Sequence, residues 1–405
     1  MAASLFITGR YNRESRSALA RRLVVDKRVI VASIVLLLLL GGLVGVLLLR
    51  EETTGEEEGD TGEQDRGINC GVARVTLVGA GASFLHPQVD LWAREFSKVC
   101  PNVRIDYSPI GSGAGQRQFL EKVVDFAGTD PPLVGDIFER ARADPRGLIQ
   151  IPVVVGAVVV VYNIPELGGA KLRLTGEVIA LIYLGEIEYW DDPRIAALNP
   201  GLRLPNKPII AVHRSDASGT TNIFTQFLFK SSGGIWPREL VGLAVNWPVA
   251  EKGRALGGKG NAGVAEIVAR TPYSIGYLEY SHAVLAGLPW ALIRNRDGVF
   301  VDATPETIAA AAAGAYAFFP VHHDGDFSRA WSEVIFAPGR NAYPIASFSF
   351  LIFYRTYPAE KIDAIKAFIQ WIMTEGSKHM VQGYVAMPQE VREYNLRAVE
   401  LIRSS

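Results

Sequence analysis

The chain has 405 residues, of which 49% are hydrophobic and 20% are charged, and its formal net charge is −1. This length suits about two or three globular domains of ordinary composition. A net charge near zero creates no general attraction to nucleic acid, so we expect no nucleic-acid partner. Six histidines and two cysteines, with no C-x-x-C pair, offer little material for a metal site. We therefore expect no metal and no other cofactor.

The first predicted element is an apolar helix over residues 29–49, VIVASIVLLLLLGGLVGVLLL, which contains no charged residue. Such a helix would be about 31 Å long, which is enough to cross a bilayer. A buried soluble helix and a cleaved signal peptide are the alternatives. A signal peptide normally has a shorter apolar run with a small-residue cleavage site close behind it, so a retained anchor is favoured.

The charges that flank this apolar run predict its orientation. Residues 1–28 are rich in arginine, whereas residues 51–67, EETTGEEEGDTGEQDRG, are acidic and contain no apolar side chain. Positively charged flanks stay on the cytoplasmic side. We therefore expect a cytoplasmic basic tail over 1–28, a single-pass membrane anchor over 29–49, and a flexible acidic linker over 50–69 that leads to an extracytoplasmic domain.

The two cysteines, Cys70 and Cys100, are both in the part expected outside the cytoplasm, where disulfides can form. A disulfide would close a loop of some thirty residues and stabilise the fold by about 3–4 kcal/mol on the chain-entropy model. Two unpaired buried thiols are the alternative, and the sequence leaves both open.

Apolar runs alternate with amphipathic stretches along the rest of the chain. The run at 148–164 is too rich in valine for a helix and is typical of buried strands. The alternation predicts an α/β fold with parallel sheets, and two long β runs at 153–160 and 344–352 indicate two lobes with a ligand between them. In chain order we expect a strand at 72–79, a helix that buries Val89, Trp92, Phe96 and Val99, a strand at 102–110, a helix at 114–124, strands at 148–164, 207–214 and 345–355, and a helix at 359–373.

Three segments share a strand, a short loop of small residues and a helix: 78–87 (VGAGASFLHP), 109–116 (PIGSGAGQ) and 214–224 (RSDASGTTNIF). Free backbone N–H groups and the helix dipole make such helix starts anion-binding sites. Plain N-capping, as by Ser218 before Gly219, would explain any one of them. Three such loops together with an arginine favour a binding role.

The same loops do not match the motifs of common enzymes. Phe84 and Gln116 stand where a dinucleotide-binding G-x-G-x-x-G would have its last glycine. The sequence also contains no G-x-x-x-x-G-K-[ST], no H-E-x-x-H and no G-x-S-x-G. We therefore expect a binding protein rather than an enzyme.

The order of several motifs resembles the phosphate-binding receptors of ABC-type phosphate importers. These motifs are GAGASF, IGSGAG, DFAGTDPPL, YLGEIEYWDDPRIAALNPGLRLP, HRSDASGTTNIF, GKGNAGVAEIV and SIGYLEYSHA, and the likeness runs from Leu77 to Met387. It implies two lobes of the type II periplasmic-binding-protein fold, which close on one phosphate. We place lobe I at 70–154 plus 346–405 and lobe II at 155–345.

The resemblance also implies a set of phosphate ligands. Asp216 would hold the guanidinium of Arg214. Small departures from the family pattern, at Leu85-His86, Gly113 and Ala217, remove no ligand. The implied ligands are Ser83, Phe84 through its backbone N–H, Ser112, Asp130, Arg214, Ser218, Gly219 and Thr220.

The chemistry of these residues is coherent without the resemblance. Arg214 offers a planar fork of donors, and the hydroxyls donate hydrogen bonds. Asp130 would repel an anion, but phosphate carries protons near pH 7 and can donate one to a carboxylate, whereas sulfate cannot. Asp130 is therefore the expected selectivity element, with a structural turn aspartate as the alternative. The segment 257–263, GGKGNAG, is expected only to turn and start a helix.

The sequence thus predicts a monomeric, membrane-tethered receptor at the cell surface that binds inorganic phosphate and passes it to the permease of an ABC-type importer. A receptor for another tetrahedral oxyanion is the main alternative. An enzyme acting on phosphate esters is the second alternative.

Overall fold

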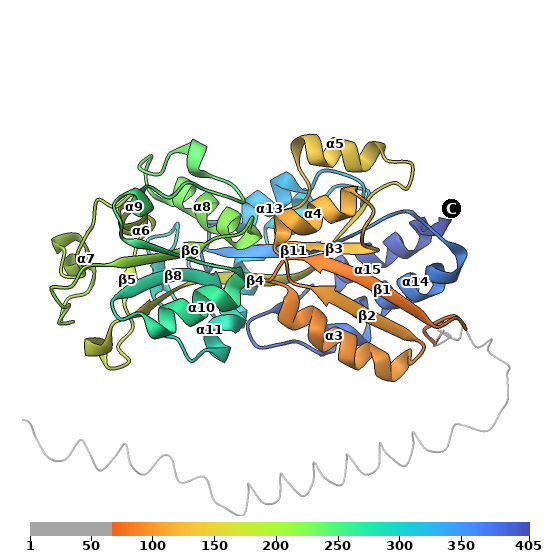
Figure 1. Cartoon of the computed structure of the whole chain (residues 1–405), viewed down its shortest axis with the longest axis horizontal. Helices are drawn as coiled ribbons and strands as arrows, with labels where there is room; N and C mark the ends of the chain where they lie inside the picture. Colours follow the sequence, from red (N-terminus) through yellow and green to blue (C-terminus); the bar gives the residue numbers. More distant parts are fainter. Residues whose placement is uncertain (1–66) are drawn as a thin grey trace, which may run out of the picture. The chain divides into compact units, whose positions relative to one another are not determined.

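The computed structural model describes residues 67–405 (Figure 1). The predicted basic tail, the anchor and nearly all of the acidic linker lie outside these residues. No helix within residues 67–405 is long and apolar enough to cross a membrane. These described residues form one compact unit.

A nine-stranded sheet runs through this unit in the order β2-β1-β3-β11-β4-β8-β6-β7, and β13 also pairs with β4. Two small sheets, β10-β9-β5 and β12-β14, complete the strands of the described residues. The strands are β1 Val75–Gly81, β2 Val103–Ser108, β3 Phe126–Thr129, β4 Ile149–Asn163, β5 Arg173–Leu174, β6 Ile210–Arg214, β7 Ala255–Gly258, β8 Ser274–Glu279, β9 Leu292–Arg294, β10 Phe300–Val301, β11 Ala346–Phe353, β12 Thr356–Tyr357, β13 Val385–Ala386 and β14 Arg403–Ser404.

Helices pack around the large sheet on both sides of its central strands (Figure 1). The α-helices are α3 His86–Val99, α4 Ser112–Leu120, α5 Gly135–Ala143, α6 Gly176–Tyr183, α7 Pro193–Leu198, α8 Gly219–Ser231, α9 Pro248–Glu251, α10 Gly260–Arg270, α11 Tyr280–Leu285, α12 Pro305–Ala312, α13 Ser328–Val334, α14 Ala359–Met373 and α15 Gln389–Leu396.

The large sheet is mixed, so the prediction of parallel sheets was wrong. Within each outer group the strands are parallel, but β11 runs antiparallel to β3 and β4, and β4 runs antiparallel to β8. The sequence did not reveal this because β11 arrives from nearly two hundred residues beyond β4, and local periodicity carries no information on such pairing.

The central strand β4 decides where the two outer groups meet. Its first part, Ile149 to Ala157, pairs with β11, and its second part, Val158 to Asn163, pairs with β8. Because β1, β2 and β3 run in the direction of β4 while β6, β7 and β8 run against it, the two groups point toward each other. Their carboxyl ends, and the helix starts that follow, therefore come together near the middle of the sheet.

Most predicted local elements have the expected type, with differences at their ends. The predicted helix at 359–373 matches α14. The predicted helix at 114–124 instead ends at Leu120, because Lys122 adopts a left-handed conformation with φ 63° that interrupts the helix. Val99, the last residue of α3, was expected in the core but is 48% exposed, whereas Val89, Trp92 and Phe96 are buried.

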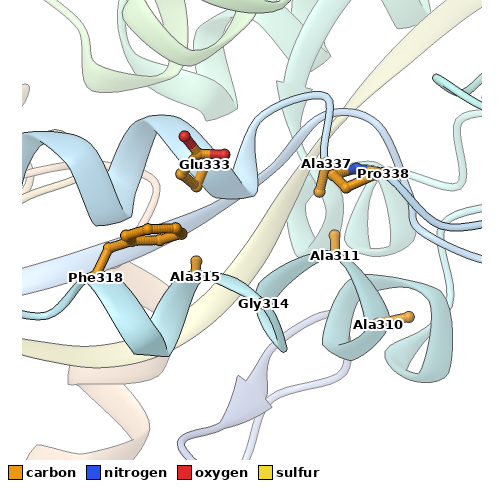
Figure 2. A pocket seen from close by; sticks show the side chains of 8 residues that line it. All are labelled: Ala310, Ala311, Gly314, Ala315, Phe318, Glu333, Ala337 and Pro338. Atoms are coloured by element: carbon orange, nitrogen blue, oxygen red, sulfur yellow. The ribbon is translucent and has the colours of Figure 1, made fainter.

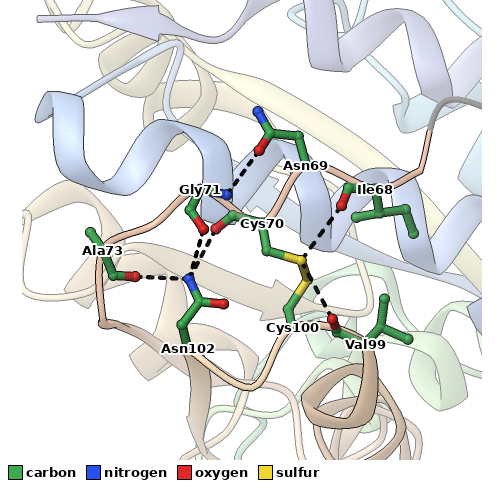
Figure 3. The surroundings of a disulfide bond; sticks show 8 residues. All are labelled: Ile68, Asn69, Cys70, Gly71, Ala73, Val99, Cys100 and Asn102. Atoms are coloured by element: carbon green, nitrogen blue, oxygen red, sulfur yellow. Dashed lines mark hydrogen bonds between the residues drawn. A yellow bond between two sulfur atoms is a disulfide. The ribbon is translucent and has the colours of Figure 1, made fainter.

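A disulfide links Cys70 to Cys100, with 5.5 Å between their Cα atoms and 30 positions between them in sequence (Figure 3). Of the two alternatives left open by the sequence, pairing is the one observed. The amide of Asn102 donates to the carbonyl oxygens of Gly71 and Ala73, at 3.1 and 2.9 Å, and supports the same turn. The bond therefore joins the segment before β1 to the end of α3.

Removing this disulfide should lower stability without changing the binding site. We expect the double variant Cys70→Ala, Cys100→Ala to lose about 3–4 kcal/mol of unfolding free energy, because the unfolded chain regains the entropy of a 30-residue loop. Urea denaturation of the variant and the wild type would measure the loss. Equal stability of the two proteins would contradict the prediction.

Candidate functional site

The predicted ligands lie where the carboxyl ends of the two strand groups meet. Ser83 and Phe84 follow β1, Asp130 follows β3 directly, and Arg214 is the last residue of β6. Ser112 is the first residue of α4, Ser218 is the N-cap of α8, and Gly219 and Thr220 open α8. Although they come from distant parts of the chain, all of these residues are buried, with at most 5% of their surface exposed where they are polar.

Arg214 is held in place by its neighbours. Its Nε and Nη2 donate to the two carboxylate oxygens of Asp216, at 2.8 and 2.5 Å, and its Nη1 donates to Thr220 Oγ1 at 3.2 Å. Burial raises the pKa of Asp216, but the hydrogen bonds and charge of Arg214 outweigh this effect and lower it from its ordinary value. The pair therefore stays ionised, and the guanidinium has a fixed orientation.

Asp130 belongs to the opposite strand group and has a different environment. Ser349 Oγ donates to its Oδ1 at 2.8 Å, and Ser112 Oγ donates to its Oδ2 at 3.3 Å. Burial raises the pKa of Asp130 from 3.8 to about 7, against the opposing effects of Ser349, Arg214 and Ser112. The carboxyl group is therefore poised to gain or lose a proton near neutral pH.

The two groups of loops are in direct contact at this point. A Cβ atom on Gly219 would lie 2.3 Å from Asp130 Oδ2 and 2.5 Å from Ser112 Oγ, so only glycine fits there. The backbone N–H of Gly113 donates to the carbonyl oxygen of Ala217 at 3.1 Å. The start of α8 thus packs directly against the carboxylate and hydroxyl of the other strand group.

Ser218 and Phe84 belong to the cluster in different ways. The hydroxyl of Ser218 has two roles, whereas Phe84 can take part only through its backbone. Ser218 Oγ accepts from the N–H of Thr221 at 3.2 Å, which makes it the N-cap of α8 and leaves its own hydroxyl hydrogen to donate. The ring of Phe84 is buried and packs edge-on to Tyr384, so any ligand role of Phe84 rests on its backbone N–H.

Sequence reasoning missed two residues that join this cluster, Asn261 and Ser349. Asn261 lies in the first turn of α10 and contacts both Ser83 and Thr220. The segment β7–α10 repeats the design of a strand, a glycine loop and a helix start, and this repetition was a usable signal. Ser349 lies within β11 and has no local signal, because its contact with Asp130 depends on the placement of β11 beside β3.

His282 hydrogen-bonds to the backbone of Ser83, and Glu279 caps the helix α11 that carries His282. His282 Nε2 lies 3.1 Å from the carbonyl oxygen of Ser83, and burial lowers the pKa of His282 to about 4. The ring is therefore neutral near pH 7, and Nε2 must be the donor because a carbonyl only accepts. Glu279 accepts from the N–H groups of Ser281 and His282 and so caps α11.

The unfolding free energy should depend on pH through the buried carboxyl of Glu279. Burial raises the pKa of this carboxyl from 4.5 to about 8. Its contribution to stability is full below about pH 4.5 and is lost as the pH rises through about 8, because the folded state holds its proton more tightly. We expect the unfolding free energy of the wild type to fall by about 0.7 kcal/mol from this group between about pH 7.5 and 8.5, because a fully held proton gives about 1.4 kcal/mol per pH unit and the folded carboxyl is on average about half protonated in this interval.

Urea denaturation of Glu279→Gln at the same pH values is the measurement. The variant should show a shallower slope than the wild type, whatever its absolute stability. His282 and His323, whose pKa values burial lowers to about 4, do not titrate in the folded state in this range. An identical slope in the two proteins would show that Glu279 does not hold a proton there.

A separate pocket of about 250 Å³ lies between α12 and α13 (Figure 2). It is lined by small apolar side chains of α12 and its neighbours, by Phe318 and by Pro338. Among the described residues that line it, Glu333 alone is charged. This pocket offers no positive charge for an anion and has no part in the cluster described above.

Comparisons with known proteins identify the family of the chain. A PBP superfamily domain matches residues 54–375. The chain is 43% identical over 332 residues to a phosphate-binding protein PstS of Methanocaldococcus jannaschii, covering 80% of this chain and 85% of that protein. It is 39% identical over 329 residues to a phosphate-binding protein PstS of Pasteurella multocida, covering 78% of this chain and 87% of the relative.

Solved structures extend the likeness to the fold. A putative phosphate ABC transporter substrate-binding protein from Clostridium perfringens, solved with bound phosphate, has a TM-score of 0.54 and 18% identity, and the match covers 78% of this chain and all of that chain. The mixed sheet, the site at its middle and the superfamily match define a protein of the periplasmic-binding-protein class. Within that class, the chain belongs to the PstS family of phosphate-binding proteins. The relatives are named as phosphate-binding proteins, and the chain is accordingly a binding protein of this family and not an enzyme.

Proposed function

We infer that this protein is the extracytoplasmic receptor of an ABC-type phosphate importer and that it binds inorganic phosphate where the two strand groups meet. The observation that carries this inference is the meeting of a fixed guanidinium, several hydroxyls and two helix starts with a buried carboxyl of raised pKa. Relatives over 37% identical that cover most of the chain are named as phosphate-binding proteins.

The two sides of the proposed site have different tasks. Arg214, Ser218, Gly219 and Thr220 supply positive charge, hydroxyl hydrogens and helix-end N–H groups, which suit the oxygens of an anion. From the other side, Ser83, Ser112 and the N–H of Phe84 would complete the shell. Asp130, when ionised, would accept a hydrogen bond from a protonated phosphate oxygen, which sulfate cannot offer.

We propose that binding couples to closure of two lobes. Lobe I would comprise residues 70–154 and 346–405, and lobe II residues 155–345. The change of partner along β4, between Ala157 and Val158, supports this division because the strand pairs with β11 before this point and with β8 after it. Since each lobe would contribute only half of the ligands, phosphate would favour the closed arrangement.

We also propose that residues 29–49 anchor the receptor in the cell membrane, with 1–28 in the cytoplasm and 50–69 as a tether. The absence of charge in the apolar run and the basic residues before it support this topology. Alkaline extraction of membranes tests it, since an anchored protein stays in the pellet. If the soluble fraction contained a chain with the mass of the full-length protein, this would contradict the anchor.

Isothermal titration calorimetry of the full-length chain in detergent, with phosphate and with sulfate, tests the proposed function. We expect phosphate binding and at least ~10⁴-fold weaker sulfate binding, because sulfate leaves a buried acceptor unpaired. No phosphate binding would overturn the proposal, and equal affinities would favour a general oxyanion receptor.

A further inference from the structure

Asn261 is a fully buried amide that connects the two sides of the site. It lies in the first turn of α10, and its backbone N–H and its Nδ2 both donate to Ser83 Oγ, at 3.2 and 3.1 Å. Ser83 follows β1, in the opposite strand group, 178 positions away in the chain. The same amide also contacts Thr220 Oγ1, so it touches hydroxyls from both sides.

The orientation of this amide is determined by a neighbour that can only donate. The backbone N–H of Glu279 donates to Asn261 Oδ1 at 3.0 Å. Because a backbone N–H has no acceptor, the amide atom facing it must be the oxygen. The amide nitrogen is therefore the atom that faces Ser83.

The hydrogen bonds of Ser83 then define the direction of its hydroxyl hydrogen. A serine hydroxyl has one donor and two acceptor lone pairs. The two donors of Asn261 occupy both lone pairs of Ser83 Oγ. Among the described residues no acceptor is hydrogen-bonded to the Ser83 hydroxyl, so its O–H remains available to an oxyanion.

The hydroxyl oxygen of Thr220 also lies next to hydrogen-bond donors of neighbouring side chains. Arg214 Nη1 donates to Thr220 Oγ1 at 3.2 Å, and Asn261 Nδ2 lies 3.3 Å from the same oxygen. Asn261 Oδ1 lies at an equal 3.3 Å, so this contact constrains Thr220 less tightly than the pair of donors constrains Ser83. Asn261 therefore constrains mainly Ser83.

We propose that Asn261 is a positioning residue for phosphate, which makes the Ser83 hydroxyl a hydrogen-bond donor and ties it to the start of α10 across the site. This proposal rests on the proposed function, because it assigns the Ser83 hydroxyl to a phosphate oxygen. Both amide atoms of Asn261 are hydrogen-bonded to protein groups, so Asn261 acts through Ser83.

A double-mutant cycle on the full-length chain tests the proposal, with phosphate affinity measured by calorimetry. We expect Asn261→Ala to weaken binding by about tenfold, because Ser83 loses the side-chain donor and keeps only the backbone N–H of residue 261, which leaves one lone pair of its hydroxyl unoccupied and its hydrogen less firmly oriented. In a Ser83→Ala background the same change should alter affinity by less than about twofold, since no hydroxyl remains to orient. An equal loss in both backgrounds, or no loss in either, would overturn the proposal.

Asn163→Ala is the matched control, because its amide bonds the carbonyls of Val268 and Ala269 at the other end of α10. It should lower the melting temperature and leave phosphate affinity unchanged. Reduced affinity in this control would mean that any disturbance of α10 suffices, which would also overturn the proposal.

Asn261→Asp provides a second variant of the same shape, in case the alanine variant does not fold. Its second oxygen would draw the Ser83 hydrogen away from the ligand, so affinity should fall by more than tenfold near pH 7. Lowering the pH should narrow the gap to the wild type, because a protonated carboxyl regains a donor. A gap that does not change with pH would count against the proposal, whereas a wild type that binds no phosphate would overturn the proposed function as well.

Discussion

Replacing Arg214 by alanine should weaken phosphate binding by about 30-fold to several thousand-fold, the range expected for removing one partner of a buried, hydrogen-bonded charge pair. The side chain of Arg214 is only 1% exposed, and Asp216 fixes the plane of its guanidinium through two hydrogen bonds. Its loss would remove charge-assisted donors and leave the partly buried Asp216 without its partner. Calorimetry with phosphate measures the effect.

The phosphate affinity of Arg214→Lys should lie between those of the wild type and the alanine variant, because lysine keeps the charge but lacks the planar fork of donors that Asp216 holds. Arg254→Ala is the matched control, since Arg254 also pairs with a carboxylate, Glu188, and bonds the carbonyl of Gly185 away from the site. We expect unchanged phosphate affinity in that control. Tight binding by folded Arg214→Ala would show that the site lies elsewhere.

Replacing Asp130 by asparagine should reduce the preference for phosphate over sulfate by at least about 100-fold, out of an expected ~10⁴-fold. The amide would present a donor where the carboxylate offers an acceptor, and sulfate oxygens accept hydrogen bonds readily. Competition calorimetry with the two anions measures the ratio. Asp125→Asn is the control, because Asp125 bonds Lys361 and the N–H of Val78 on the outside of this strand group.

The same selectivity should depend on pH in the wild type. Burial raises the pKa of Asp130 to about 7, so the ionised acceptor is lost as the pH falls through that value in the ligand-free protein. We expect the phosphate preference to decline from pH 8 toward about pH 5 in the wild type and to stay nearly constant in Asp130→Asn. A preference that is independent of pH in both would exclude Asp130 as the discriminating group.

Local patterns in the sequence were sufficient for the type of the eight elements predicted from them and for three of the loops at the site. The apolar spacing of 359–373 predicts α14 to the residue, and the small residues of 214–224 mark the end of β6 and the start of α8. These features depend on neighbours in the chain, since periodicity, capping and the need for close backbone approach are all local properties.

Three features depended on the tertiary structure. The antiparallel insertion of β11 between β3 and β4 brings Ser349 to Asp130, and no pattern within 345–355 foretells it. The pKa of Asp130 depends on burial by segments far away in sequence. The role of Asn261 depends on the distance between α10 and Ser83.

The sequence by itself therefore determined the elements, the small-residue loops and, through its motifs, the family. Only the tertiary structure decided that the carboxyl ends of the two strand groups face each other, which amide orients which hydroxyl, and that Cys70 pairs with Cys100. The physical reason is that element type follows from interactions over a few residues. Site geometry, burial and hydrogen-bond direction follow instead from contacts between segments that are distant in the chain, such as the 30 positions between Cys70 and Cys100 and the 178 between Ser83 and Asn261.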